Sequence, residues 1–131
     1  MSQLDVVIPF TTAELTRAAL EAANRMAGGL NAKLRLIRIQ LVPYPMDLRQ
    51  SPVYIEFLKN QLAQFESSLP TAGEVRLARE FEPGLEGALR TDSLVILATR
   101  KRLWRTRTER IAAALRRAGH KVVLIVEKRN A

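Results

Sequence analysis

Residues 93–127 constrain the fold of this chain more than any other stretch. Ser93–Thr99 and Lys121–Glu127 consist mainly of leucine and β-branched residues, which is typical of strands that are covered on both faces. A helix between two such strands makes a βαβ unit, and the strands of that unit run parallel in one sheet. The stretch therefore predicts an α/β fold.

The helix of this unit is predicted from the spacing of its apolar residues. Trp104, Ile111 and Leu115 recur at intervals that place them on one helical face. We expect a helix that begins near Leu103 and buries Trp104 against the sheet.

The connection that precedes this helix is basic. Open α/β sheets bind ligands outside the carboxyl ends of their strands, where this connection would lie, so we expect it to form part of any site. Between Thr99 and Arg110 it carries Arg100, Lys101, Arg102, Arg105, Arg107 and Arg110.

The net charge of +8 arises from the same part of the chain. Residues 98–131 hold eleven of the 21 Lys and Arg residues and two of the 13 Asp and Glu residues, which gives this segment +9 and the first 97 residues −1. The asymmetry indicates an anionic ligand, nucleic acid or an acidic protein partner, and the alternative is a solvated basic face. Nucleic acid is the least favoured, because Trp104 is the only aromatic residue near the basic run.

Earlier in the chain, the pattern predicts three strands and three helices. Thr11 and Glu14 have the spacing of a capping box for the first helix, and Ser51 supplies an N-cap for the second. The strands are Leu4–Phe10, Leu34–Leu41 and an edge strand at Val75–Phe81, and a short third helix spans Leu85–Arg90. The whole order predicts one domain, residues 1–131, with a single doubly wound, Rossmann-like sheet of five parallel strands and helices on both faces.

Several classes of protein are disfavoured by what the sequence lacks. It has no cysteine, one histidine and no glycine-rich phosphate loop or Gly-x-Ser-x-Gly motif, which argues against an enzyme built on a metal or a catalytic triad. No stretch approaches the length of a membrane span, and no signal peptide is recognisable. We expect a cytoplasmic protein without membrane insertion.

Four stretches resemble the universal stress protein family. They are an opening strand that ends near proline, Asp5–Phe10; a glycine turn, Glu82–Gly84; the strand that leads into the nucleotide loop, Val95–Thr99; and the last turn and strand, Ala118–Val126. The resemblance covers nearly the whole chain and implies an adenine nucleotide alpha hydrolase-like fold. It also implies a regulatory or stress-response function and a homodimer that pairs through the final strand, Lys121–Glu127.

The chain departs from this family at the ATP site. The resemblance places Thr11 where ATP-binding members carry an acidic residue, and residues 98–108 where they carry Gly-x2-Gly-x9-Gly-(Ser/Thr). Residues 98–108 contain no glycine. Glycines let backbone N–H groups approach phosphate, whereas Arg and Lys side chains bind it directly.

Two hypotheses follow for the function. The first is a universal-stress-protein-like regulatory module that does not bind ATP in the family's usual manner. The second is a protein that binds ATP, another nucleotide or polyphosphate through an Arg/Lys-rich loop. Its predicted ligand-binding residues are Thr11, Thr99, Arg100, Arg102 and Arg107. The alternative for this loop is a solvated surface, or ion pairs with Glu80, Glu82 and Glu86.

The remaining polar residues are expected to be structural. Asp5 stands at the beginning of a strand, which favours a capping or turn role. Thr106 and Thr108 are predicted on the surface of a helix, and His120 in a surface turn.

Overall fold

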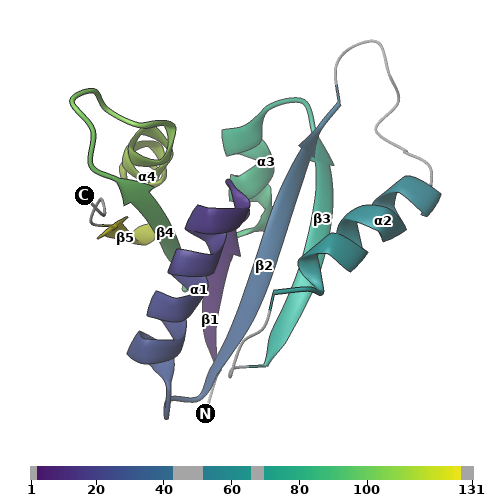
Figure 1. Cartoon of the computed structure of the whole chain (residues 1–131), viewed down its shortest axis with the longest axis horizontal. Helices are drawn as coiled ribbons and strands as arrows, with labels where there is room; N and C mark the ends of the chain where they lie inside the picture. The colour runs from purple at the N-terminus through teal and green to yellow at the C-terminus, as the bar shows by residue number, and fades with distance from the viewer. Residues whose placement is uncertain (1–2, 43–51, 66–69, 128–131) are drawn as a thin grey trace.

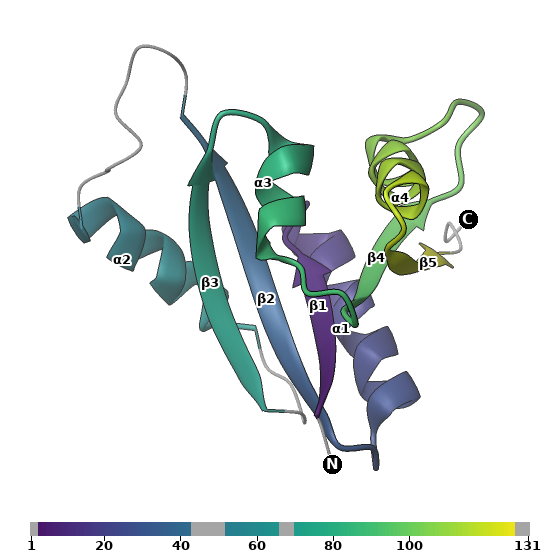
Figure 2. The same ribbon diagram turned by 180° about the vertical axis from the view of Figure 1, so that it is seen from behind.

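The computed structural model describes residues 3–42, 52–65 and 70–127. These residues form a five-stranded parallel sheet with helices on both faces (Figures 1 and 2). Ser51, the predicted N-cap, lies outside the described residues. The strands are β1 (Leu4–Pro9), β2 (Ala32–Leu41), β3 (Thr71–Ala78), β4 (Leu94–Arg100) and β5 (Lys121–Glu127). The helices are α1 (Ala13–Ala27), α2 (Pro52–Leu62), α3 (Phe81–Ala88) and α4 (Arg107–Arg117).

The strand order, β3-β2-β1-β4-β5, confirms the predicted doubly wound fold and places β3 at an edge. The chain leaves β1 toward β2 on one side and leaves β4 toward β5 on the other, so the winding reverses between β1 and β4. These two strands pair only where Val6 and Val7 lie beside Leu94 and Val95. They diverge toward their carboxyl ends (Figure 1), and such a switch point is where doubly wound sheets form a crevice.

Each face of the sheet carries its own apolar core. Alternate side chains of the central strands, such as Val6, Ile8 and Ile96, pack with the alanine-rich face of α1 and with Leu62 of α2. The side chains between them pack with α3 and α4 on the opposite face. Burial on both faces explains why β1 and β4 read as continuous apolar runs.

The boundary between β3 and α3 differs from the prediction. Val75–Phe81 was expected to be a strand and Leu85–Arg90 a helix, but β3 ends at Ala78 and α3 begins at Phe81. Pro83 was read as a turn residue, although it is the third residue of α3. The first backbone N–H groups of a helix have no intrahelical partner, so a proline there removes no helical hydrogen bond.

Two other helix starts are also corrected. The N-cap of α1 is Thr12, whose hydroxyl accepts a hydrogen bond from the Leu15 N–H, so the predicted Thr11–Glu14 capping box is wrong by one residue. Helix α4 begins at Arg107, not near Leu103, because Thr106 and Glu109 form a capping box there. Trp104 therefore lies in the preceding loop and is 83% exposed, so the prediction that it is buried is wrong.

No helix in the described part of the chain is long and apolar enough to cross a membrane.

Candidate anion site at the carboxyl ends of β1 and β4

A cavity of about 270 Å³ opens at the switch point between β1 and β4. Its walls come from the segment that follows β1, the first turn of α1, the end of β4, the β4–α4 loop (residues 101–106) and the first turn of α4. The structure places all five predicted ligand-binding residues in these walls, and the full lining is Thr11, Thr12, Glu14, Leu15, Thr99, Arg100, Arg102, Thr106, Arg107 and Thr108. The signal that brought the five together was their position at or just beyond the carboxyl ends of β1 and β4.

Three guanidinium groups and one carboxylate give the cavity a net positive charge. Arg100 forms an ion pair with Glu14, across the gap between the β4–α4 loop and α1. The Arg107 guanidinium lies over the Phe81 ring, 4.8 Å from its centroid, a cation–π contact that positions it. Within the described part of the chain, Arg102 makes no hydrogen bond or ion pair, so its guanidinium is available to an anion.

The base of the β4–α4 loop is fixed by hydroxyl groups. The side chains of Thr99, at the end of β4, and Thr106, the N-cap of α4, share a hydrogen bond of 2.6 Å. The Thr106 hydroxyl also accepts from the Glu109 N–H, while the Glu109 carboxylate accepts from the Thr106 N–H. The hydrogen bond from the Thr106 N–H, with a further contribution from the Thr106 side chain, holds the pKa of Glu109 below its ordinary value. Thr108, predicted on the surface, is buried in the structure.

Two helices begin at the cavity. Thr12 caps α1 and Thr106 caps α4, and both residues lie in the lining. Helix N-termini carry a partial positive charge that favours anions. The cavity therefore combines two helix N-termini with three arginines, a combination suited to a phosphate or carboxylate group.

The alternative expected for the basic loop, pairing with Glu80, Glu82 and Glu86, is not what the described residues show. Arg100 instead pairs with Glu14, and Arg107 packs on Phe81. Lys101, Arg102 and Arg105 are exposed.

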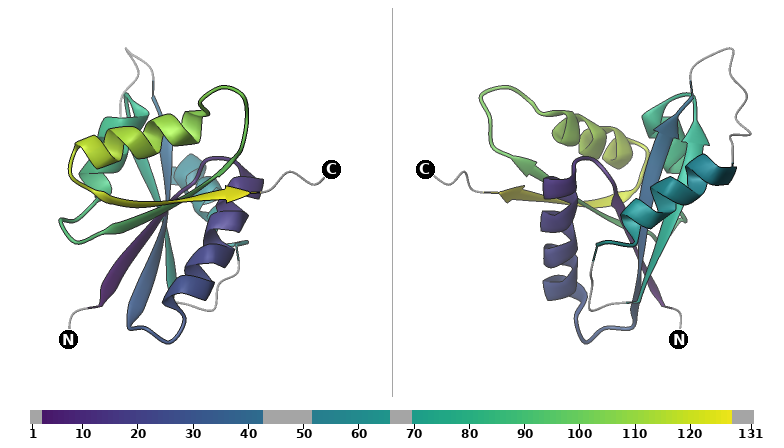
Figure 3. Two further views of the ribbon diagram at one scale, coloured as in Figure 1. Left: turned by 90° about the vertical axis from the view of Figure 1, so that its left-hand side faces the viewer. Right: turned by 45° about the vertical axis from the view of Figure 1, so that its right-hand side comes forward.

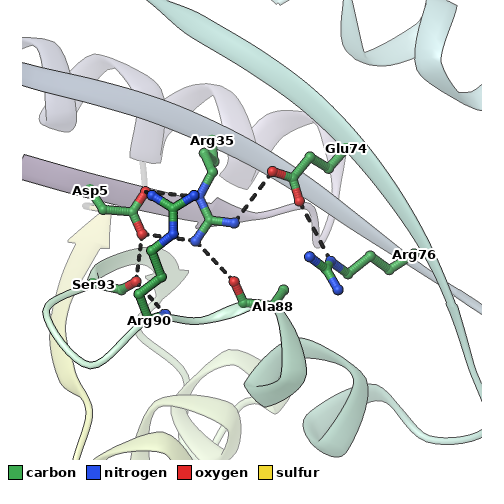
Figure 4. A network of polar contacts seen from close by, with 7 residues as sticks. All are labelled: Asp5, Arg35, Glu74, Arg76, Ala88, Arg90 and Ser93. Carbon is green, nitrogen blue, oxygen red and sulfur yellow. Dashed lines mark hydrogen bonds and ion pairs between the residues drawn. The ribbon is translucent and has the colours of Figure 1, made fainter.

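A buried ionic network, which the sequence reasoning missed, occupies the other end of the sheet (Figure 4). The Arg35 guanidinium donates to both carboxylate oxygens of Asp5 at 2.8 Å, to the Ala88 carbonyl at 2.9 Å and to Glu74 at 3.3 Å. The Ser93 hydroxyl donates to Asp5 at 2.6 Å. The predicted capping or turn role for Asp5 is therefore wrong.

The network is structural in character. Asp5 and Arg35 are 5% and 4% exposed, and no buried side-chain polar atom in the described residues lacks a partner. The hydrogen bonds from Arg35 lower the pKa of Asp5, against the opposing effect of burial. A signal was present in the sequence, since both residues interrupt apolar runs at positions that face the α3–α4 side of the sheet.

Another cavity, of about 320 Å³, lies between α1 and the end of α2. Its lining contains one cation and one carboxylate, Arg17 and Glu21, and Arg17 already packs over the Phe65 ring. Its lining includes no residue of β4 or of the β4–α4 loop, and it lacks an excess of either charge.

Comparison with known proteins places this geometry in context. By sequence, no family model and no curated protein matches the chain. By structure, it is similar to a universal stress protein from Archaeoglobus fulgidus, with a TM-score of 0.62, 11% identity and 93% of each chain covered. The chain has the universal stress protein fold.

Two further solved structures support this fold. A universal stress protein family member from Burkholderia pseudomallei has a TM-score of 0.56 and 17% identity over 92% of this chain and 94% of that one. A universal stress protein in complex with cAMP has a TM-score of 0.57 and 15% identity over 99% of this chain and 100% of that one.

Proposed function

We propose that this chain is a regulatory binding module with the universal stress protein fold, and that it binds a phosphate-bearing small molecule, such as a nucleotide, through arginine side chains. The observation that carries the proposal is the cavity at the switch point, where Arg100, Arg102 and Arg107 meet the N-termini of α1 and α4. One structural neighbour was solved with cAMP, which supports a nucleotide as the first class of ligand to test.

The manner of binding would differ from that of a glycine loop. Residues 98–108 contain no glycine, so side chains and not backbone N–H groups would contact the phosphate. The cavity, about 270 Å³, is close to the lower end of the range for small-molecule sites. It therefore suits a phosphate and its sugar, with the rest of the ligand extending outward.

Glu14 is expected to weaken the binding of an anion in the cavity. Its ion pair with Arg100 occupies a guanidinium that an anion would otherwise contact. An incoming phosphate would displace the Glu14 carboxylate, and binding would be weakened by the cost of that exchange.

The proposal is tested by calorimetric titration with Mg-ATP, cAMP and tripolyphosphate at near-physiological salt. We expect saturable binding of one ligand per chain for at least one of the three. Arg102→Gln should weaken it by about tenfold or more, since a hydrogen bond to a charged group contributes about 1.5–3 kcal/mol. Arg25→Gln, on the last turn of α1, is the matched control and should leave the affinity unchanged. No heat with any of the three, or equal affinities for the two variants, would contradict the proposal.

The module is also proposed to act as a homodimer through β5. This edge strand presents five successive apolar residues, Val122–Val126, all of them half-buried or exposed in the single chain. An unpaired edge with apolar side chains is well suited to pair with a second copy.

A further inference from the structure

The β4–α4 loop carries two large apolar side chains in full contact with solvent. Leu103 is 98% exposed and Trp104 is 83% exposed. The loop projects beyond the end of β4, away from the sheet (Figures 1 and 3). Scattered apolar residues are common on protein surfaces, but two adjacent ones at the end of a projecting loop form an outward-facing apolar tip.

Positive charge surrounds this tip on both sides. Lys101 and Arg102 precede it and Arg105 follows it, and all three side chains are exposed. The loop thus combines a small apolar tip with a cationic collar.

This combination matches the surface of an anionic membrane. Tryptophan favours the boundary between headgroups and acyl chains. Each Lys or Arg near an anionic leaflet strengthens binding by about fivefold. A bilayer can receive a convex tip without a complementary pocket.

An acidic protein is the competing partner, and the observations favour it less. A stable protein interface covers about 800 Å² on each partner, with the anchoring residues ringed by other contacts. Here the exposed apolar surface of the loop is confined to Leu103 and Trp104.

We propose that this loop docks the protein on membranes that contain anionic phospholipids. Leu103 and Trp104 enter the interfacial layer, while Lys101, Arg102 and Arg105 contact the lipid headgroups. Such docking needs no spanning helix, and entry into the interfacial layer is confined to the side chains of Leu103 and Trp104. The docking does not rest on the proposed ligand site, because, of these five residues, only Arg102 also lines the cavity.

The test uses Trp104, the only tryptophan, as its own reporter. The full chain is mixed with vesicles of phosphatidylcholine alone, or of phosphatidylcholine with phosphatidylglycerol, and sedimentation and tryptophan emission are measured. We expect cosedimentation with the anionic vesicles only, together with a shift of the emission to shorter wavelength.

Variants distinguish the contribution of the apolar tip to vesicle binding from the contribution of the protein's positive charge. Leu103→Gln keeps the reporter and should weaken binding by about tenfold, because it removes the burial of one leucine. Lys101→Gln and Arg105→Gln should each weaken it by about fivefold. The matched controls are Leu30→Gln and Lys33→Gln, exposed residues near the start of β2, and they should bind as the unaltered protein does.

Three results would overturn the proposal. The first is no binding to anionic vesicles, which would favour an acidic protein as the partner of the loop. The second is binding without an emission shift. The third is equal weakening by Leu103→Gln and Leu30→Gln, because the tip would then contribute nothing specific.

Discussion

At the scale of single residues, the side chain of Arg35 connects more of the fold than any other polar group described above. It joins β1 through Asp5, β3 through Glu74 and the end of α3 through the Ala88 carbonyl. Removing one partner of a buried ion pair leaves the other charge uncompensated, which costs about 3–5 kcal/mol. We predict a loss of this size in the free energy of unfolding for Arg35→Met, measured by urea denaturation.

Arg76→Met is the matched control for this prediction. Arg76 also pairs with Glu74, at 3.5 Å, but its side chain is 45% exposed. Exposed pairs contribute little, so the change should stay within about 0.5 kcal/mol. Similar losses in the free energy of unfolding for Arg35→Met and Arg76→Met would show that burial does not determine how much the Arg35 ion pair contributes to stability.

Because of the same ion pair, we expect the stability of the protein to depend on pH. The pKa of Asp5 is lowered in the folded chain from its ordinary value of 3.8, chiefly by the hydrogen bonds from Arg35. The folded state therefore binds the Asp5 proton less readily than the unfolded state. The stabilisation is present above the unfolded pKa and is lost as the pH falls through the folded one.

Asp5→Asn isolates this contribution. The difference in the free energy of unfolding between the unaltered protein and Asp5→Asn should be largest near neutral pH and should shrink below about pH 4. Urea titrations at several pH values measure it. A difference that stays constant as the pH falls would contradict an ionised Asp5 in the folded state.

At the scale of elements, α3 depends on one glycine for its approach to the sheet. A Cβ at Gly84 would lie 2.6 Å from the Ala78 Cβ and 3.2 Å from Ile39 Cγ2. Gly84→Ala should therefore destabilise the protein by about 1–3 kcal/mol through overpacking.

Gly87 lies in the same helix and provides the control. A Cβ there would meet nothing within 4 Å, so Gly87→Ala should raise stability by about 0.5–1 kcal/mol through helix propensity. Thermal denaturation of the two variants measures both effects. If Gly84→Ala and Gly87→Ala change the stability in the same direction, the close packing of α3 on the sheet is not the cause of the effect at Gly84.

The elements were predictable where a single signal dominated. The apolar runs predicted β1, β2, β4 and β5 to within two residues at each end. Burial on both faces leaves little ambiguity for the inner strands β1, β2 and β4. The expectation that β5 is also covered on both faces is wrong, because it is an edge strand whose side chains are half-buried or exposed. The errors arose where two signals competed. The helical spacing of Trp104 led to a predicted helix start near Leu103, and the Thr106–Glu109 capping box was not recognised. Pro83 was read as a turn residue although the first turn of a helix accepts proline.

The residues of the candidate site could be predicted from the sequence, whereas the buried ionic network could not. Thr11, Thr99 and the arginines were found by their position at or beyond the carboxyl ends of β1 and β4, which topology alone supplies. The Asp5–Arg35 pair requires the register of β1 against β2 and the approach of the α3–β4 connection. The spacing of residues within a short stretch of sequence does not predict those long-range contacts.

At the scale of the whole molecule, the proposed homodimer predicts a measurable mass. Light scattering during size-exclusion chromatography should give twice the 14.7 kDa of one chain. Val126→Lys, at a position 53% exposed on β5, should shift the mass toward one chain, because like charges would meet across the paired edges. Leu41→Lys, at a similarly exposed position at the end of β2, should leave the dimer intact. A single-chain mass for the unaltered protein would contradict pairing through β5.

The central claim is that an arginine-lined cavity at the switch point binds phosphate-bearing ligands, and an NMR titration of the backbone amides with Mg-ATP tests it most directly. The account predicts saturable shifts that cluster at Thr11, Thr99, Arg102 and Arg107, in the cavity between the carboxyl ends of β1 and β4. Shifts confined to Arg116 and Arg117 in the last turn of α4, or no shifts at all, would contradict it.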